Sequence, residues 1–236
     1  MKPTLMLLPG LMCDAAVWAP QVEGLADGAD VRVVQYGLSD SLTAMAQLVL
    51  DSAPPGPFAM AGHSMGGRVA FEVLRLAPER VARVALLDTG VHPLAGGEAG
   101  EKERAGRMAL LQIARTQGMR AMGQQWAAGM VHPDHRATPV FEAILQMLER
   151  SNPDQFAAQI QALLGRPDAA PQLSAIQCPS LVLCGREDLW SPPQQHQAMA
   201  ERIAGVVLEV IEHCGHMSTM EQPAAVNQAL RRWLQD

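Results

Sequence analysis

Aromatic residues, long apolar runs and basic clusters are all scarce in this sequence. The 236 residues include four phenylalanines, four tryptophans and one tyrosine, against 14 methionines. No apolar run is long enough to span a membrane,. The net charge of −6, with no basic block, argues against nucleic acid as the main partner and does not favour a membrane surface,. We therefore expect a small-molecule partner.

Cysteine is also rare, and its spacing excludes the common metal motifs. The four cysteines form no Cys-x-x-Cys pair, so neither zinc nor a redox motif is expected,. The apolar run at the start of the chain is short and is interrupted by Pro9 and Gly10. Met12 is too bulky for a usual cleavage site before Cys13,. We therefore expect reduced thiols, no signal peptide and a cytoplasmic protein.

What the sequence does contain is a regular alternation of strand and helix patterns. Hydrophobic residues make up 48% of the chain, enough for a sizeable core. Short, continuously apolar runs are typical of strands buried on both faces of a parallel sheet, and they occur at 3–10, 31–37, 57–62, 81–90, 179–185 and 205–211. Patterns with helical spacing separate most of them. This alternation predicts an α/β fold with right-handed crossovers.

Residues 92–172 break the alternation. They contain no good strand pattern but four apolar stripes with helical spacing, and Asn152 followed by Pro153 resembles a helix cap,. We predict a helical lid inserted between two strands of a core that comprises 1–91 and 173–236. Additional core helices are the alternative interpretation of this block.

The pattern Gly62-His63-Ser64-Met65-Gly66 lies where a strand pattern ends and a helix pattern begins. In that context Gly-x-Ser-x-Gly indicates a nucleophile elbow, a tight turn that exposes the serine at the carboxyl end of the sheet. A serine hydroxyl needs a neighbouring base, and the base needs an orienting group. Asp188 follows one predicted strand and His216 follows the next, in the chain order expected for this architecture,.

These motifs together resemble the α/β-hydrolase superfamily, in particular its small, lid-bearing serine esterases and lactonases. The similarity covers nearly the whole chain and is strongest at 5–18, 58–90, 179–193 and 211–222. It implies that Ser64 is the nucleophile, His216 the base and Asp188 the acid that orients His216. Asp88 is the alternative acid in such folds, and Glu187 is a neighbour that could be mistaken for it. His63 lies inside the elbow and His213 precedes the Gly-His pair, so neither is expected to be the base.

The resemblance also implies an oxyanion hole made of the backbone N–H groups of Leu11 and Met65. Relatives usually have His-Gly-x in the first loop, where this chain has Pro9-Gly10-Leu11. Asp14 and Trp18 match a family pattern that fixes this loop, and ordinary capping and packing is an equal alternative for them. Relatives mostly begin with an extra hairpin that this chain lacks. We therefore predict a parallel sheet of about six strands.

The combined prediction is a carboxylesterase-like hydrolase that works through an acyl-enzyme, without metal or cofactor. The expected substrate is a small to medium, largely apolar carboxylic ester, and the expected pocket residues are Met12, Trp126, Trp190 and Met217. Arg68 and Arg186 lie near the predicted site residues in sequence, so a carboxylate-bearing substrate is an alternative. Hydrolysis of an enol-lactone, a thioester or a C–C bond is the alternative, and so is perhydrolysis, because all use the same triad. A non-catalytic binding protein is the competing class, and a monomer or small homo-oligomer is expected.

Overall fold

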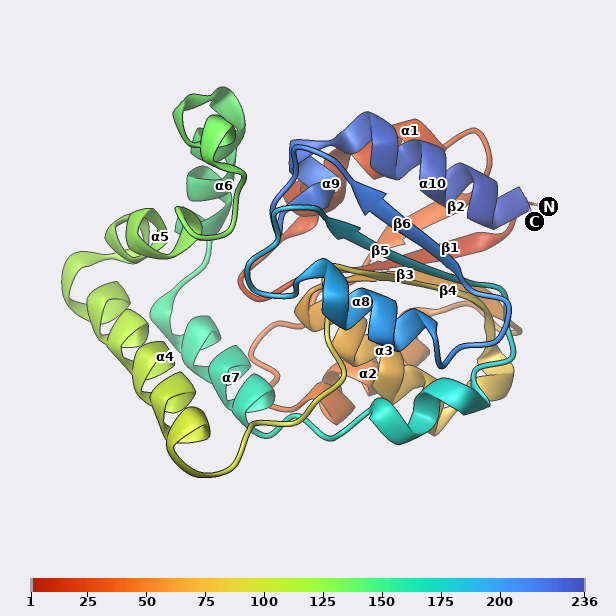
Figure 1. The fold of residues 1–236 in the computed structure, drawn as a ribbon, viewed down its shortest axis with the longest axis horizontal. Coiled ribbons are helices and arrows are strands. Elements are labelled where there is room, and N and C mark those ends of the chain that lie inside the picture. Colours follow the sequence, from red (N-terminus) through yellow and green to blue (C-terminus); the bar gives the residue numbers. More distant parts are fainter. Residues whose placement is uncertain (1, 236) are drawn as a thin grey trace.

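A six-stranded, wholly parallel sheet forms the centre of the molecule (Figure 1). The computed structural model describes residues 2–235. The strand order across the sheet is β2-β1-β3-β4-β5-β6, and the strands are β1 (Thr4–Leu8), β2 (Asp30–Val33), β3 (Phe58–His63), β4 (Val81–Leu87), β5 (Ser180–Gly185) and β6 (Val207–Ile211). The prediction of a six-stranded parallel sheet is confirmed.

The strands differ in burial according to their place in the sheet. Every residue of β3 and β5 is buried, as continuously apolar runs predict,. The edge strands β2 and β6 are only partly covered, and Val207 is 44% exposed. The expectation of burial on both faces is therefore wrong for β2 and β6. An edge strand has a neighbour on one side only, so it contacts fewer covering side chains than a central one.

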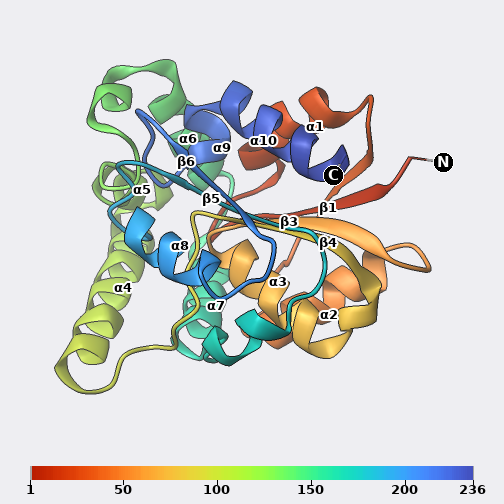
Figure 2. The same cartoon turned by 45° about the vertical axis from the view of Figure 1, so that its right-hand side comes forward.

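Helices cover both faces of the sheet (Figures 1 and 2). One face carries α1 (Ala19–Leu25), the short α9 (Ser218–Glu221) and α10 (Pro223–Gln235), and the other carries α2 (Leu42–Ser52), α3 (Met65–Leu76) and α8 (Pro193–Ala200). The apolar stripe of α3 is buried, and so is the charged Glu72 of the same helix. Its carboxylate accepts hydrogen bonds from Thr43 Oγ1 (2.6 Å) and Arg75, which explains how a charged residue is tolerated at the contact between α2 and α3,.

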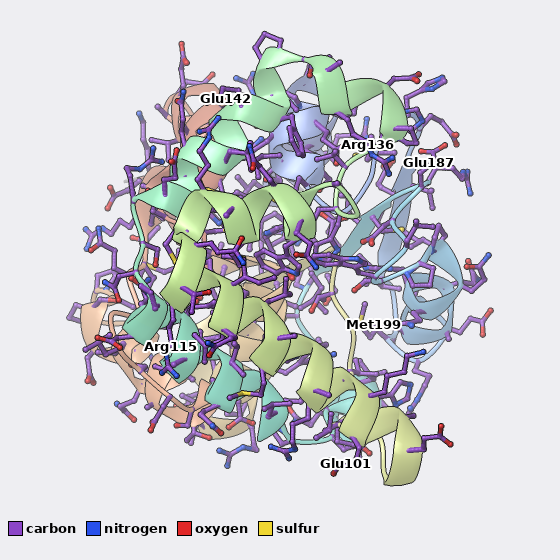
Figure 3. All side chains as sticks on the ribbon, turned by 90° about the vertical axis from the view of Figure 1, so that its left-hand side faces the viewer. Glu101, Arg115, Arg136, Glu142, Glu187 and Met199 are labelled. Carbon is purple, nitrogen blue, oxygen red and sulfur yellow. The ribbon has the colours of Figure 1, made fainter. Side chains whose placement is uncertain are left out.

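Four helices lie between β4 and β5, and we call them the inserted helices: α4 (Gly97–Gln117), α5 (Met119–Ala127), α6 (Pro139–Glu149) and α7 (Pro153–Leu164). They lie beyond the end of the sheet toward which the strand arrows point (Figure 1). Figure 3 looks onto them, with Glu101 near one end of the long α4. Asn152 caps α7 by accepting from the N–H groups of Asp154 and Gln155,. The four helices match the four stripes in the sequence.

The described chain, residues 2–235, contains no helix that is both long and apolar enough to cross a membrane. Its four cysteines are all free thiols.

Candidate active site

Ser64 stands at the sharp junction of β3 and α3. Its backbone has φ 56° and ψ −114°, a conformation that side chains rarely adopt,. Glycine is required on either side because the chain segments touch. A Cβ on Gly62 would lie 2.4 Å from the Gly66 carbonyl oxygen, and one on Gly66 would lie 2.0 Å from that of Leu8. The junction therefore presents the Ser64 side chain at the carboxyl end of the sheet.

The structure brings Ser64, His216 and Asp188 into one chain of hydrogen bonds. Ser64 Oγ lies 2.8 Å from His216 Nε2, and His216 Nδ1 lies 2.8 Å from Asp188 Oδ2. The other carboxylate oxygen of Asp188 accepts from the N–H groups of Trp190 and Ser191 at 2.8 and 2.9 Å. These bonds fix the carboxylate, which in turn orients the imidazole with Nε2 free to accept the serine proton.

The electrostatics of the pair favour a basic imidazole beside an ionised carboxylate. Burial raises the pKa of Asp188, but the positive charge and hydrogen bond of His216 and the N–H groups of Ser191 and Trp190 together lower it, so the net shift is downward,. Burial lowers the pKa of His216, but the charge and hydrogen bond of Asp188 and the charges of Asp88 and Glu221 together raise it, so the net shift is upward,. His216 is thus a stronger base than an isolated histidine.

Leu11 and Met65 lie on two segments that meet at the elbow. Gly10 packs so closely there that a Cβ on it would lie 3.3 Å from the Ser64 Cβ. Within residues 2–235, the backbone N–H groups of Leu11 and Met65 have no hydrogen-bond acceptor, and both residues line the same cavity as Ser64. Two backbone donors without a partner therefore belong to residues that line the cavity with Ser64.

The loop that carries Leu11 is held by the inserted helices. Met12 has a positive φ of 63°, and its N–H donates to the buried Gln159 Oε1 of α7 at 2.8 Å. Asp14 caps the turn at Ala16 and pairs with Arg150 at 2.6 Å. The sequence pointed to Asp14 and to the fully buried Trp18 but missed Gln159 and Arg150, because no local pattern marks contacts between residues so far apart.

Asp88 and His63 lie behind the triad rather than in it. Asp88 accepts from Ser218 Oγ and from the Gly185 N–H. Of the two aspartates, only Asp188 is hydrogen-bonded to His216 Nδ1. His63 Nε2 donates to the His216 carbonyl oxygen at 2.8 Å. Burial lowers the pKa of His63 to about 4, so it is neutral and serves as a support for the His216 loop,.

Glu187 and His213, the other residues weighed as acid and base from the sequence, make structural contacts instead. Glu187 accepts from the Cys214 N–H at 2.9 Å, and the His213 carbonyl accepts from Gln222. Neither side chain lines the cavity that contains Ser64. They support the turns that carry Asp188 and His216.

A cavity of about 450 Å³ has Ser64 and His216 in its wall, a volume typical of small-molecule sites,. Trp126 and Trp190, both expected in the pocket, line it with their rings 5.3 Å apart, and Trp190 lies 5.1 Å from the His216 ring. Met12 and Met217 do not line it: both are buried in the core beneath, with Met12 turned toward Ser151. Their assignment to the pocket is corrected accordingly.

The cavity wall is less apolar than the sequence led us to expect. It includes four cationic residues and one carboxylate, namely Arg68, Lys102, Arg107, Arg166 and Glu103. Arg186, the other arginine noted in the sequence, lies elsewhere: its exposed side chain pairs with Glu212 at 2.6 Å. The arginines of α4 and of the end of α7 carried no signal in the sequence, because helical arginines are ordinarily solvent-facing.

Comparison with known proteins gives one family. A family model described as "Alpha/beta hydrolase family" matches residues 5–229. (E)-2-((N-methylformamido)methylene)succinate hydrolase from Acinetobacter baylyi is 30% identical over 98% of this chain and 90% of its own length. 2-Hydroxy-6-oxononadienedioate/2-hydroxy-6-oxononatrienedioate hydrolase from Klebsiella pneumoniae is 24% identical over 99% of this chain and 87% of its own.

Solved structures agree. A thermophilic esterase from Thermogutta terrifontis, solved with malate bound, is 30% identical with a TM-score of 0.85 and covers 99% of this chain and 91% of that one. An enol-lactonase from Burkholderia xenovorans is 23% identical with a TM-score of 0.83 and covers 100% and 92%. At 23% identity, the similarity to the enol-lactonase shows only that the two proteins have the same fold.

Proposed function

Because the chain belongs to the alpha/beta hydrolase family, we propose that it is a serine hydrolase that cleaves a carboxylic ester or lactone through an acyl-enzyme. The single observation that carries this proposal is the hydrogen-bonded chain from Ser64 through His216 to Asp188, with two free backbone N–H groups beside the hydroxyl. A nucleophile, an oriented base and oxyanion donors are the parts that acyl transfer needs.

The proposed reaction has two halves. In the first, Ser64 Oγ attacks the substrate carbonyl carbon while its proton passes to His216 Nε2, and the developing oxyanion accepts hydrogen bonds from Leu11 and Met65 N–H. The intermediate collapses, the bond to the leaving oxygen breaks, and His216 gives its proton to that oxygen. In the second half, water attacks the acyl-enzyme with His216 as base, and the acid is released as Ser64 regains its proton.

The inserted helices have a proposed role as a lid over this reaction. They supply Trp126 and two of the cationic residues around Ser64, Lys102 and Arg107, and they lie at the end of the sheet where the elbow opens. Closing such a site excludes water from the charged intermediate and strengthens each electrostatic contact. The boundaries proposed for the lid are those predicted from the sequence, 92–172.

Hydrolysis of a bond other than an ester or lactone is the second candidate. It is favoured by the names of the two relatives, which describe hydrolases of a substituted succinate and of oxo-dienedioates rather than of simple esters. A thioester or a C–C bond beside a carbonyl would use the same nucleophile, base and oxyanion donors. The bond cleaved therefore has to be established by assay.

The test is a substrate panel with Ser64→Ala and fluorophosphonate labelling. We expect the wild type to hydrolyse a 4-nitrophenyl ester or a lactone and to be labelled at Ser64. Ser64→Ala should lose roughly 10³-fold to 10⁶-fold in kcat and all labelling. Unchanged turnover in Ser64→Ala would remove the nucleophile assignment. Turnover of a thioester or a C–C substrate alone would replace the ester and lactone proposal with the second candidate.

A further inference from the structure

Cationic side chains from three parts of the fold meet in the cavity wall beside Ser64. Arg68 is on α3, one helical turn after the nucleophile, or about 6 Å along the helix axis at 1.5 Å per residue,. Lys102 and Arg107 are on α4, and Arg166 follows α7. We call these four residues the cationic wall.

The cationic wall has more positive charge than its surroundings neutralise. Glu103 is the single carboxylate among the cavity-lining residues in the described part of the chain. It is already shared, at 2.7 Å from Arg166 and 3.0 Å from Arg107. Three positive charges therefore remain in excess around the cavity.

Within residues 2–235, Lys102 and Arg68 are the two members of the wall without a charged partner, and Arg68 is the one that is partly buried. Its Nη1 donates to the His92 carbonyl oxygen at 2.9 Å. Within residues 2–235, no carboxylate oxygen lies close enough to the Arg68 guanidinium to form an ion pair with it. Burial, and then the positive charge of Arg166, lower the pKa of Arg68 to about 9. A partly buried guanidinium without a counter-charge is costly unless an anion binds beside it.

The ion pairs between α4 and the end of α7 give a structural reason for part of the cationic wall, but not for Arg68. Glu103 with Arg107 and Arg166 fastens α4 to the end of α7, which is a sufficient structural reason for those three residues. Arg68 takes no part in that fastening and belongs to the core helix that carries the elbow. Its hydrogen bond to the His92 carbonyl oxygen leaves the positive charge of its guanidinium uncompensated, so the charge is available to a ligand in the cavity.

We propose that the cationic wall binds a carboxylate of the substrate, so that the ester or lactone cleaved at Ser64 carries a free acid group a few bonds from the scissile carbonyl. This inference rests on the proposed function and narrows its substrate class. The planar guanidinium forks match the two oxygens of a carboxylate. The apolar Trp126, Phe156 and Leu163 in the same cavity suit the carbon skeleton between the two groups.

The decisive experiment compares substrates that differ in charge but hardly in shape. One pair is mono-4-nitrophenyl glutarate and the corresponding glutaramate, with the charge on the acyl side. The other is 3-carboxyphenyl and 3-carbamoylphenyl pentanoate, with the charge on the leaving group. After subtraction of spontaneous hydrolysis, we expect the carboxylate to be preferred at least 10-fold in kcat/KM in one of the pairs. We also expect that preference to shrink in 0.5 M NaCl.

Variants assign the preference to the wall. Arg68→Gln should lower kcat/KM for the preferred carboxylate substrate at least 10-fold and change the neutral partner less than 3-fold. Arg107→Gln is the second variant if Arg68→Gln fails to fold. Arg186→Gln is the matched control, since that arginine is paired with Glu212 away from the cavity, and it should keep the full preference.

A binding measurement separates this inference from the proposed function. Glutarate should bind Ser64→Ala in calorimetry at least 10-fold more tightly than the uncharged diamide glutaramide or inorganic phosphate, and Arg68→Gln in that background should abolish the difference. Tighter phosphate binding would overturn the carboxylate assignment. Ser64-dependent turnover with no charge preference in either pair, or an equal loss for both partners in Arg68→Gln, would overturn the inference while leaving the hydrolase standing. Glutarate binding without turnover of any ester or lactone would support the carboxylate site but overturn the proposed ester or lactone hydrolysis.

Discussion

At the scale of single residues, the site depends on groups that are forced into unusual states. Ser64 has a positive φ, His216 has a raised pKa, and the neighbouring His63 is kept neutral by burial. Each state follows from close contacts around it: the tight β3–α3 junction, the Asp188 carboxylate, and the lack of water around the His63 ring. The reactivity of the hydroxyl is therefore a property of its neighbours.

The pH dependence of kcat/KM should report His216. The base works only when neutral, so activity falls as the pH drops through its pKa, which Asp188 holds above 6.5 despite burial,. Asp188→Asn removes that charge, so the acid limb should move to lower pH while kcat at neutral pH falls roughly 10²-fold to 10⁴-fold. A pH-rate profile of both proteins measures this. An acid limb that stays in place in Asp188→Asn would assign it to another group.

At the scale of elements, the loop after β1 is shaped by α7. The Met12 N–H is satisfied by Gln159, and Leu11 beside it offers its own N–H to the cavity. A loop held at the residue next to the proposed oxyanion donor leaves that donor little freedom. Gln159 is thus a positioning residue, because it acts through the loop rather than on the substrate.

Gln159→Met should test this positioning. Methionine keeps the length of the side chain but cannot accept from the Met12 N–H, so we expect kcat to fall about 10-fold with KM within 3-fold of the wild type. The unpaired N–H should also lower the free energy of unfolding by about 1–3 kcal/mol. Gln161→Met, at an exposed position on the same helix, is the matched control and should change neither value. A proportionate rise in KM would point instead to a role in substrate binding.

At the scale of the whole molecule, the inserted helices and the sheet share one core. The His216 N–H donates to the Met130 carbonyl at 2.5 Å, and Glu221 of α9 accepts from the N–H groups of His132 and Gly215. A Cβ on Gly215 would lie 2.4 Å from the Met130 carbonyl oxygen. The segment after α5 is thus part of the wall that holds His216, the proposed base.

This shared core predicts a single unfolding transition. In differential scanning calorimetry we expect one peak whose calorimetric and van't Hoff enthalpies agree, because the inserted helices cannot unfold without exposing the His216 loop. Loss of hydrolase activity on heating should coincide with that peak. Two separated peaks, with activity lost in the first, would show that residues 92–172 unfold independently.

The sequence was sufficient where function depends on local pattern and chain order. Gly62-x-Ser64-x-Gly66 defined the elbow, and the strand ends placed Asp188 and His216 at the same edge of the sheet. It was insufficient where function depends on tertiary contacts. Gln159 reaches the Met12 loop, and Arg107 and Arg166 reach the cavity, only because of how the inserted helices are laid over the sheet, and helical periodicity does not encode that orientation. Met12 and Met217 were misplaced for the same reason: closeness in sequence to the site does not decide which way a side chain points.

The long separation between β4 and its neighbour β5 has a consequence for the protein while it is being made. Strand β4 pairs with β5 through residues such as Leu87 and Leu183, so the whole of the inserted segment must be translated before that pairing can form. At about 5–20 residues per second, the β4 edge waits roughly 5 to 20 seconds on the ribosome with its backbone hydrogen-bonding groups unpaired on that side. Ser64 emerges in the first third of the chain, but its partners Asp188 and His216 emerge last. A nascent chain is therefore inactive until its final strand is in place, and it is most in need of chaperone protection in the interval before.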